Sequence, residues 1–258
     1  CTGPAGNAID VAYGNVTVNR LRVYNNGNDG CNLAAVTTTG GSISLSRTQI
    51  YDNDAGFTSS GSMVQIDYSG IYGNRGNGIR IADAGSFAVR RTTISGNGIL
   101  GSSAGLMITG SPGEIQDVTV VNNDRYGIRI SGNSVVRMRN SLFAANVQNC
   151  DVPDAVFGAG QFYSNFYDDA GCGVENSSLH NQTAFVGPLG FYGGATPVHR
   201  PLTTVSPVID YDNDCTGTGN DQRGLTRVVG FKSNLAKCDI GSVELQNDEI
   251  YFDSLEWF

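Results

Sequence analysis

Closely spaced carboxylates near the C-terminal end of the sequence are the strongest candidates for binding a ligand. Asp210, Asp212 and Asp214 alternate along a short loop, and Asp221 follows eleven residues after Asp210. Alternate side chains of such a loop converge on one oxygen-lined point, which suits the hard cation Ca²⁺. The pattern therefore predicts a calcium site made by Asp210, Asp212, Asp214 and Asp221. The alternative is a purely structural role for Asp210 and Asp221.

Arginines in the repeated part of the chain are the candidates for general-base chemistry. Arg80, Met107 and Arg129 occupy equivalent positions in successive repeats, and Arg90 and Arg137 form a second predicted row. A polysaccharide lyase would need such an arginine beside carboxylates that hold Ca²⁺. No tight acidic pair recurs on successive repeats, so we favour solvent-exposed charges on a sheet face. The nearest carboxylates in sequence are Asp83, Asp117 and Asp124.

A glycoside hydrolase would instead need two facing carboxylates about 5–9 Å apart. Asp52 and Asp54 alternate along one repeat and Asp67 lies on the next, which is a weak basis for such a pair. His180 and His199 lie in irregular sequence, with no serine or cysteine nucleophile motif nearby. We therefore assign no catalytic residue and no required cofactor. Enzymatic activity stays open, with a non-catalytic role favoured.

Regularly spaced asparagines define the elements that must position these side chains. Each ends a strand-like tetrad such as Ile71-Tyr72-Gly73-Asn74, and the successive gaps are 27, 21, 23, 26, 23 and 19 residues. Repeats of this length without a helical pattern indicate a solenoid. Inward amides at equivalent bends can hydrogen-bond from turn to turn, and asparagine tolerates the left-handed conformation of a sharp corner. The predicted ladder consists of Asn26, Asn53, Asn74, Asn97, Asn123, Asn146 and Asn165.

Short alternating strands lie between the asparagines. Some begin with glycine, as in Gly78-Ile79-Arg80-Ile81, and longer ones resemble Val64-Gln65-Ile66. Alternation with a period of two turns one face inward and one outward. Stacking of such coils predicts an all-β fold, a right-handed parallel β-helix of about seven coils. On these features, residues 7–165 resemble the parallel β-helix repeats of pectate lyases and of many bacterial surface proteins.

The C-terminal third carries a more specific resemblance. Ser206-Pro207-Val208-Ile209-Asp210, then Cys215, Asp221-Gln222-Arg223-Gly224 and Cys238-Asp239-Ile240-Gly241-Ser242-Val243-Glu244, resemble the choice-of-anchor Q region of secreted bacterial β-helix proteins. The proline often found after the arginine is missing here. We expect Arg223 to be a buried structural arginine, bound to backbone carbonyls or paired with Asp210 or Asp239. The last residues, Ile250 to Glu256, resemble a proteobacterial sorting tail more loosely.

These features divide the chain into three predicted parts. Residues 1–173 form the β-helix repeats, residues 174–246 a wrapping and capping region, and residues 247–258 a tail for sorting or self-association. The cysteines fall into three local pairs, although six cysteines allow 15 pairings. An even count without a zinc motif favours an oxidising compartment, while an acylated Cys1 is the alternative to the first disulfide. The expected pairs are Cys1–Cys31, Cys150–Cys172 and Cys215–Cys238.

The charge is unevenly distributed. Residues 1–150 hold 11 basic and 9 acidic residues, net +2, residues 151–258 hold 5 and 15, net −10, and the two sum to −8. An acidic chain is a poor nucleic-acid binder, and no apolar run is long enough to span a membrane. The charge asymmetry and the apolar tail predict head-to-tail self-association. We expect a secreted or surface-displayed scaffold, adhesion or matrix protein; the alternative is a polysaccharide lyase or glycoside hydrolase.

Overall fold

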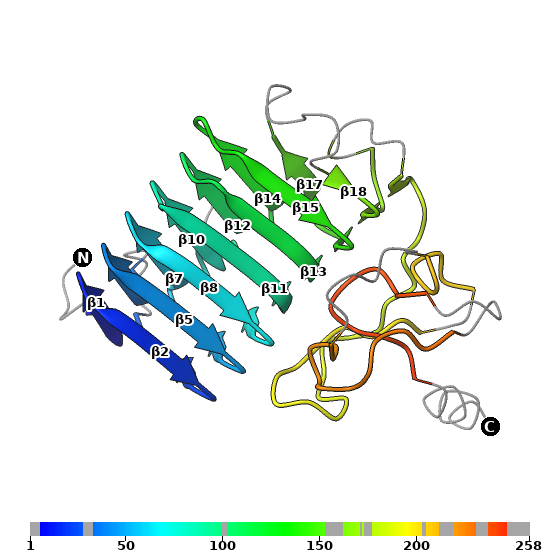
Figure 1. Ribbon diagram of the computed structural model, residues 1–258, viewed down its shortest axis with the longest axis horizontal. Coiled ribbons are helices and arrows are strands. Elements are labelled where there is room, and N and C mark those ends of the chain that lie inside the picture. The colour runs from blue at the N-terminus through cyan, green and yellow to red at the C-terminus, as the bar shows by residue number, and fades with distance from the viewer. Residues whose placement is uncertain are drawn as a thin grey trace.

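The strands of this chain stack into a parallel β-solenoid, with no helix among the described residues. The computed structural model describes residues 6–27, 33–99, 103–152, 162–170, 172, 177–202, 205–211, 219–230 and 237–246. Seven parallel strands form the first sheet, and the solenoid has about six turns (Figure 1). They are β1 (Ile9–Ala12), β4 (Ala34–Thr39), β7 (Ala55–Ser60), β10 (Ile79–Ala82), β12 (Ala104–Thr109), β14 (Tyr126–Ser131) and β17 (Gln148–Asp151).

Each turn also contributes an earlier and a later strand to the second sheet, and β11 and β13 run through both positions. The earlier strands are β2 (Asn15–Asn19), β5 (Ser42–Ser46), β8 (Met63–Asp67), β11 (Ser86–Ser95), β13 (Gly113–Val121), β15 (Val136–Arg139) and β18 (Phe162–Tyr163). The later strands are β3 (Arg22–Tyr24), β6 (Gln49–Tyr51), β9 (Gly70–Tyr72), β16 (Leu142–Ala144), β19 (Phe166–Tyr167) and β20 (Leu179–His180). A turn therefore has three corners. Corner 1 lies between the first-sheet strand and the earlier strand, corner 2 lies between the earlier and the later strand, and corner 3 leads from the later strand to the next first-sheet strand.

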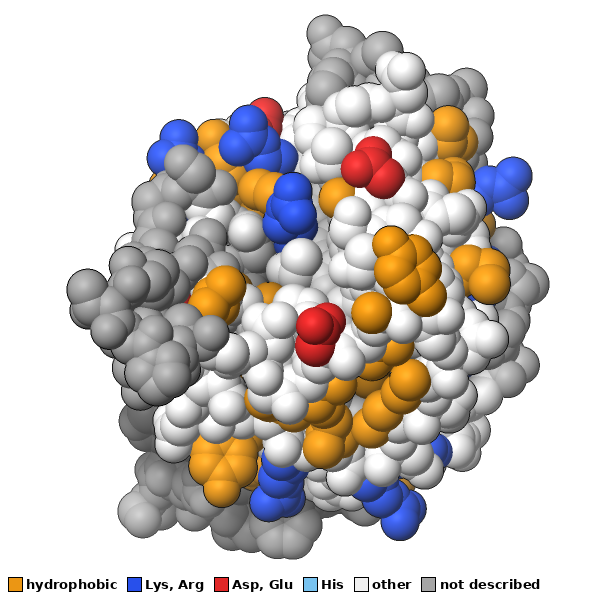
Figure 2. Space-filling model, turned by 90° about the vertical axis from the view of Figure 1, so that its left-hand side faces the viewer, with side chains coloured by type: hydrophobic (Ala, Val, Ile, Leu, Met, Phe, Trp, Pro, Cys, Tyr) orange, Lys and Arg blue, Asp and Glu red, His pale blue; other side chains and the backbone are white. Residues whose placement is uncertain are grey.

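The core is a continuous column of aliphatic side chains inside the turns. The strand register places similar side chains opposite one another on successive turns. Ile79 lies opposite Leu106 and Leu106 lies opposite Ile128, and all three are fully buried. Alternate residues point inward because side chains on a strand alternate between faces. Figure 2 looks at the end where β1 and β2 lie and shows hydrophobic side chains gathered in the middle of that end. The first-turn residues Ile9, Val16, Val18 and Leu21 are only partly buried there.

Corner 3, which leads back to the first sheet, carries the predicted asparagine ladder. The residue with positive φ is the one before each ladder asparagine, so the asparagine itself does not take the left-handed conformation. Its amide instead links the turns: Asn74 Nδ2 donates to Asn97 Oδ1 at 2.9 Å, and the Asn74 backbone N–H donates to the same oxygen at 3.1 Å. Equivalent Nδ2–Oδ1 bonds of 2.9–3.1 Å join Asn26, Asn53, Asn74, Asn97, Asn123 and Asn146 in sequence order.

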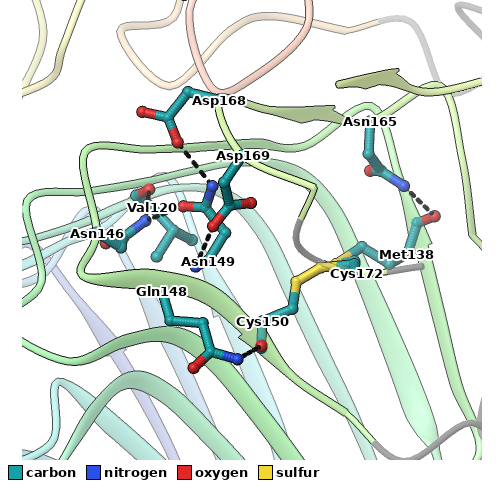
Figure 3. Close-up of a disulfide and its surroundings, with 10 residues drawn as sticks. All are labelled: Val120, Met138, Asn146, Gln148, Asn149, Cys150, Asn165, Asp168, Asp169 and Cys172. Atoms are coloured by element: carbon teal, nitrogen blue, oxygen red, sulfur yellow. Dashed lines mark hydrogen bonds between the residues drawn. A yellow bond between two sulfur atoms is a disulfide. The ribbon is translucent and has the colours of Figure 1, made fainter. Parts of the chain in front are cut away.

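The seventh predicted rung is wrong, because Asn165 belongs to a different corner. Phe162–Tyr163 pairs with the earlier strand β15, so Asn165 lies at corner 2. There its Oδ1 accepts the Ser141 backbone N–H at 3.0 Å, in a column otherwise built from serine and threonine hydroxyls. Figure 3 shows Asn165 directed at the Met138 carbonyl, apart from the ladder. The ladder continues instead from Asn146 to Asn149, whose Nδ2 donates to Asp168.

The C-terminal region, meaning the described part of residues 177–246, is almost devoid of regular strands. It lies alongside the second sheet rather than only over the end of the rod (Figure 1). Its apolar residues Val208, Ile209, Ile240 and Leu245 form a second cluster with Val121, Leu142, Ala144 and Phe166 on the outer face of the later strands. Polar contacts extend this attachment, since Gln222 donates to the Ser69 carbonyl and Ser242 to Thr119. The predicted wrapping segment therefore packs along several turns.

One predicted disulfide falls among the described residues. Cys150 and Cys172 are bridged, with their Cα atoms 5.0 Å apart (Figure 3). Cys238 is also disulfide-bonded. The predicted partner Cys215, the pair Cys1–Cys31 and the tail 247–258 lie outside the described residues, so these expectations stay predictions. None of the described segments is a helix that could cross a membrane.

Loss of a central ladder amide should destabilise the solenoid. We expect Asn97→Ala and Asn123→Ala each to lower the free energy of unfolding by about 1–3 kcal/mol, because buried backbone groups lose their partners. Asn97 Nδ2 also donates to the Ile71 carbonyl, which is buried between turns. Denaturant-induced unfolding measures the effect, and the exposed Asn133→Ala is the matched control. Unfolding curves of Asn97→Ala and Asn123→Ala that overlay the wild type would show that the ladder does not stabilise the fold.

Candidate functional site

The first predicted arginine row exists on the outer face of the first sheet. Register places Arg80 opposite Met107 and Met107 opposite Arg129, as the sequence predicted. The row continues to Asp151, whose carboxylate lies 2.9 Å from Arg129 Nε. On its other side Arg80 lies opposite Thr58. Beyond Thr58 the row ends with Thr37 and Asp10. It thus contains two carboxylates, Asp151 paired with Arg129 and Asp10 hydrogen-bonded to Thr37.

The second predicted row is wrong in register. Arg90 lies opposite Gln116, and Arg137 lies opposite Glu114, two residues away along the strand. Both arginines still point outward, because an offset of two residues keeps the same face of a strand. Arg90 forms an ion pair with Glu114 on the next turn. The structure therefore brings Arg90, Glu114 and Arg137 together, although not as a single row.

These residues lie in the outer groove, which we define as two adjoining cavities on the earlier strands of the second sheet. Their volumes are about 370 and 390 Å³, and both are lined by Ser86, Phe87 and Ala88. The first continues across β8, β5 and β2, whereas the second continues across β13 and β15. Of its charged and polar residues, the sequence singled out Arg90 and Arg137 as site candidates but not Glu114, Gln65, Ser44 or Thr17. The row along its centre is Thr17, Ser44, Gln65, Ala88, Glu114 and Arg137.

The carboxylates proposed for a hydrolase or lyase are dispersed. Asp67 pairs with Arg91 across one turn at corner 2. Asp117 is buried and accepts a hydrogen bond from Asn140 Nδ2 at 2.7 Å. Asp54 is also fully buried, with Arg75 at 3.8 Å. The remaining candidates are exposed at separate corners: Asp83 at corner 1, Asp52 at corner 3, and Asp124 beside corner 3 in a cavity with Tyr126 and Gln148.

The two histidines have structural environments. His199 Nδ1 lies 2.7 Å from the Gly187 carbonyl, and its Nε2 lies 2.8 Å from Ser95 Oγ. Because a carbonyl only accepts, Nδ1 carries the proton and Nε2 accepts from the serine. Burial lowers the pKa of His199 below its ordinary value. His180 stacks on Tyr167, and burial lowers its pKa as well.

Arg223 is a buried structural arginine, as predicted, but its partner is Asp221. Arg223 Nη2 lies 2.9 Å from Asp221 Oδ2 and donates to the Glu244 carbonyl at 2.6 Å. The other Asp221 oxygen accepts the backbone N–H groups of Arg223 and Leu225. Both oxygens of this fully buried carboxylate are therefore occupied by protein donors.

A second buried group of charges holds the end of the C-terminal region. The carboxylates of Asp239 and Glu244 both accept backbone N–H groups, and Arg227 lies between Glu244 and Asp117 at 4.0 and 3.6 Å. Burial, reinforced by the neighbouring Glu244 carboxylate, raises the pKa of Asp239. Burial also raises the pKa of Glu244. These groups stabilise the fold rather than face a substrate.

The structure describes only two of the four residues of the predicted calcium site. Asp212 and Asp214 lie outside the described residues, while Asp210 is mostly buried and Asp221 is committed to Arg223. Among the described residues no three His, Cys, Asp or Glu side chains form a potential metal cluster. Asp221 therefore fits the structural alternative, and a calcium site here would depend on Asp210, Asp212 and Asp214. The hypothesis stays a prediction.

With this geometry established, comparison with known proteins identifies the family. The family model described as the right handed beta helix region matches residues 7–193. The chain belongs to this family. No curated protein matches the sequence. The β-helix match ends before residues 206–245, so the resemblance of that segment to a choice-of-anchor Q region stays an expectation.

Acidification should loosen the attachment of the C-terminal region to the β-helix. The unfolded chain protonates His199 near its ordinary pKa of about 6.5, whereas the folded chain resists protonation down to its lowered pKa. The free energy of unfolding should therefore fall as pH drops through this window. The raised pKa values of Asp239 and Glu244 act in the opposite direction, because the folded state then binds more protons.

A comparison of variants separates the contribution of His199 to the pH dependence of stability from those of Asp239 and Glu244. Unfolding measured at about pH 7.5 and about pH 5.5 should show a smaller loss of stability on acidification in His199→Gln than in the wild type. His180→Gln should change the pH dependence less than His199→Gln does, since the pKa of His180 is also lowered but the residue is only partly buried. An identical pH dependence in His199→Gln and the wild type would disprove a buried neutral His199.

Calcium binding is tested directly by titration calorimetry. The hypothesis predicts a calcium heat that is lost in Asp212→Asn and Asp214→Asn, and a lower melting temperature in chelator. Asp221→Asn is not a clean probe, because it also removes the partner of Arg223. Absence of any heat, together with unchanged melting in chelator, would eliminate the metal site.

Proposed function

We propose that this β-helix is a non-catalytic scaffold or adhesion protein of the cell surface or extracellular matrix, with the outer groove as its binding surface. The observation that carries the proposal is the composition of that groove. It crosses successive turns without interruption, and its lining contains a single carboxylate, Glu114, which is paired with Arg90. An open, rigid and largely neutral surface suits the binding of an extended polymer.

The carboxylates next to the groove support a binding role over catalysis. A hydrolase uses two carboxylates that face each other, and a base must be free to take a proton. Glu114 is bound by Arg90, and Asp67 is bound by Arg91 from the next turn. Both carboxylates are thus occupied by guanidinium groups, so neither is free to act as the base.

The central row of the groove provides hydrogen-bonding groups at regular intervals. Thr17, Ser44 and Gln65 lie directly opposite one another on β2, β5 and β8. Neighbouring strands lie about 4.8 Å apart, so this spacing presents one polar side chain per turn to a polymer lying across the strands. The exposed Met63 adds apolar surface at the edge. Many weak, equivalent contacts are suited to adhesion to a repetitive ligand.

Secretion is part of the proposal, and the Cys150–Cys172 disulfide supports it because disulfides persist in oxidising compartments. Head-to-tail association through the coil ends and the tail 247–258 also remains part of it. The alternative is a polysaccharide lyase or glycoside hydrolase. Arg137 favours the lyase, since it is exposed in the groove, lies opposite Glu114, and has no ion pair among the described residues.

A binding assay coupled to product analysis tests the proposal. Immobilised acidic and neutral polysaccharides should retain the protein and release no oligosaccharide. Ala88 lies on the floor between the two cavities, so Ala88→Arg should block the groove and weaken retention by about tenfold. Thr58→Arg, on the outer face of the first sheet, is the matched control.

The enzyme alternative predicts a different outcome. New reducing ends or unsaturated products that disappear in Glu114→Gln would show catalysis in the groove. Retention that is equal in the wild type, Ala88→Arg and Thr58→Arg would show that the groove is not the binding surface.

A further inference from the structure

A cavity at corner 2 of the first two turns has a lining unlike that of the outer groove. It has a volume of about 460 Å³ and is lined by Arg20, Leu21, Arg22, Arg47, Gln49 and Ala195. Three of these side chains are guanidinium groups and none is a carboxylate. We propose that this cavity, the arginine cleft, binds a glycan that carries phosphate or sulfate esters. It shares no lining residue with the outer groove, so the two proposals fail independently.

The arginines of the cleft repeat the same charge on adjacent turns. Arg20 and Arg47 follow Asn19 and Ser46, which lie opposite each other in register, so the two arginines occupy equivalent positions. Like charges directly opposite each other on neighbouring strands are destabilising. Arg20, Arg22 and Arg47 have no ion pair with any described residue, whereas Arg91 at the same corner is paired with Asp67. A bound anion would neutralise the first two turns as Asp67 neutralises Arg91.

Backbone geometry gives no reason for arginine at these positions. Arg20 and Arg47 have φ values of 60° and 50°, in the left-handed region that glycine and asparagine adopt most readily. Corner 3 meets the same requirement with Asn25, Asp52 and Gly73. The arginines therefore accept backbone strain at a solvent-facing corner, which favours a role for their side chains.

Hydrogen bonds hold in place the wall of the cleft that Gln49 and Ala195 form. Gln49 Nε2 donates to the Ala195 carbonyl at 2.8 Å, and its Oε1 accepts from the Tyr72 hydroxyl at 3.0 Å. The next residue, Thr196, donates to the Tyr68 carbonyl, so this yellow part of the C-terminal region is held beside the end of β8 (Figure 1). Arg47 itself lies 5.0 Å from the centre of the Tyr68 ring. A pre-formed wall and a restrained arginine reduce the entropy lost on binding.

The number of guanidinium groups indicates the ligand chemistry. Each guanidinium forms paired hydrogen bonds with planar or tetrahedral oxyanions, and phosphate and sulfate esters offer more acceptor oxygens than a carboxylate. Three arginines around one cavity therefore suit an ester of phosphate or sulfate. Residues 151–258 carry net −10, which opposes the binding of a polyanion to that part of the chain.

An aromatic surface adjoins the cleft and favours a glycan. Arg22 and Tyr24 lie on the same face of β3, and Tyr24 is 50% exposed. Its ring stacks on Tyr51, which stacks on Tyr72, at centroid distances of 5.1 and 4.9 Å. Aromatic rings with hydroxyl groups bind the apolar faces and hydroxyls of sugars together.

Calorimetric titration of the full chain with four probes tests the proposal. The probes are a heparin-derived oligosaccharide with sulfate esters, a phosphomannan oligosaccharide with phosphate esters, an unsubstituted dextran oligosaccharide, and a DNA oligonucleotide. We expect the sulfated or the phosphorylated glycan to bind and dextran not to bind, and the one that binds identifies the ester. Binding of neither charged glycan would overturn the proposal, and DNA binding that depends on the same arginines would overturn the glycan assignment.

Variants then locate the site. Arg20→Asn and Arg47→Asn keep a residue that tolerates positive φ, so each removes a charge with little backbone strain and should weaken binding by about tenfold. Ala195→Glu should weaken binding without removing an arginine, since it places a carboxylate at the rim. Arg80→Gln is the matched control for net charge, because Arg80 lies on the first sheet. Equal loss in Arg80→Gln, or unchanged binding in all of the cleft variants, would overturn the assignment.

Discussion

The amide hydrogen bonds between successive asparagines at corner 3 are the constraint on which the other features depend. Each ladder oxygen accepts both a side-chain and a backbone N–H from the preceding turn, as Asn97 Oδ1 does from Asn74. Such a bond forms only if corner 3 of every turn lies directly over that of the last. The strands that leave this corner then have a fixed register, so outward side chains line up in rows. The groove, the tyrosine stack and the paired arginines all follow from that alignment.

Sequence reasoning recovered this alignment at corner 3, although the gaps between its asparagines vary from 21 to 27 residues, and lost it near corner 2. The tetrads identified six rungs, and the row of Arg80, Met107 and Arg129 follows from counting between them. Asn165 was misplaced because Phe162-Tyr163 and Phe166-Tyr167 are neighbouring short strands on either side of corner 2, and hydrophobic pattern alone does not distinguish them. The offset of Arg90 from Arg137 could have been counted, because Arg90 lies seven residues before Asn97, whereas Arg137 lies nine residues and Arg139 seven residues before Asn146.

The C-terminal region could not have been placed by pattern at all. It has few strands, so its backbone groups find partners in side chains that are distant in sequence. Asp239 and Glu244 accept the N–H groups of Asp210, Leu245, Val228 and Val229, in the way that a neighbouring strand would. Buried carboxylates are costly unless they are compensated; these are compensated by backbone donors, and Arg227 lies 4.0 Å from the Glu244 carboxylate. Sequence suggested a buried Arg223, but its partner Asp221 depends on a local turn that composition does not specify.

Stacking also explains why the distribution of charge on this surface is informative. A solenoid places equivalent residues beside one another, so a charge on one turn must be opposed, paired or tolerated on the next. Arg90 with Glu114, Arg91 with Asp67 and Arg129 with Asp151 are each paired between turns. Arg20 and Arg47 depart from this rule within a chain whose net charge is −8. Because opposed pairs are available elsewhere on the same framework, an uncompensated pair of arginines beside a fixed wall points to a ligand rather than to folding.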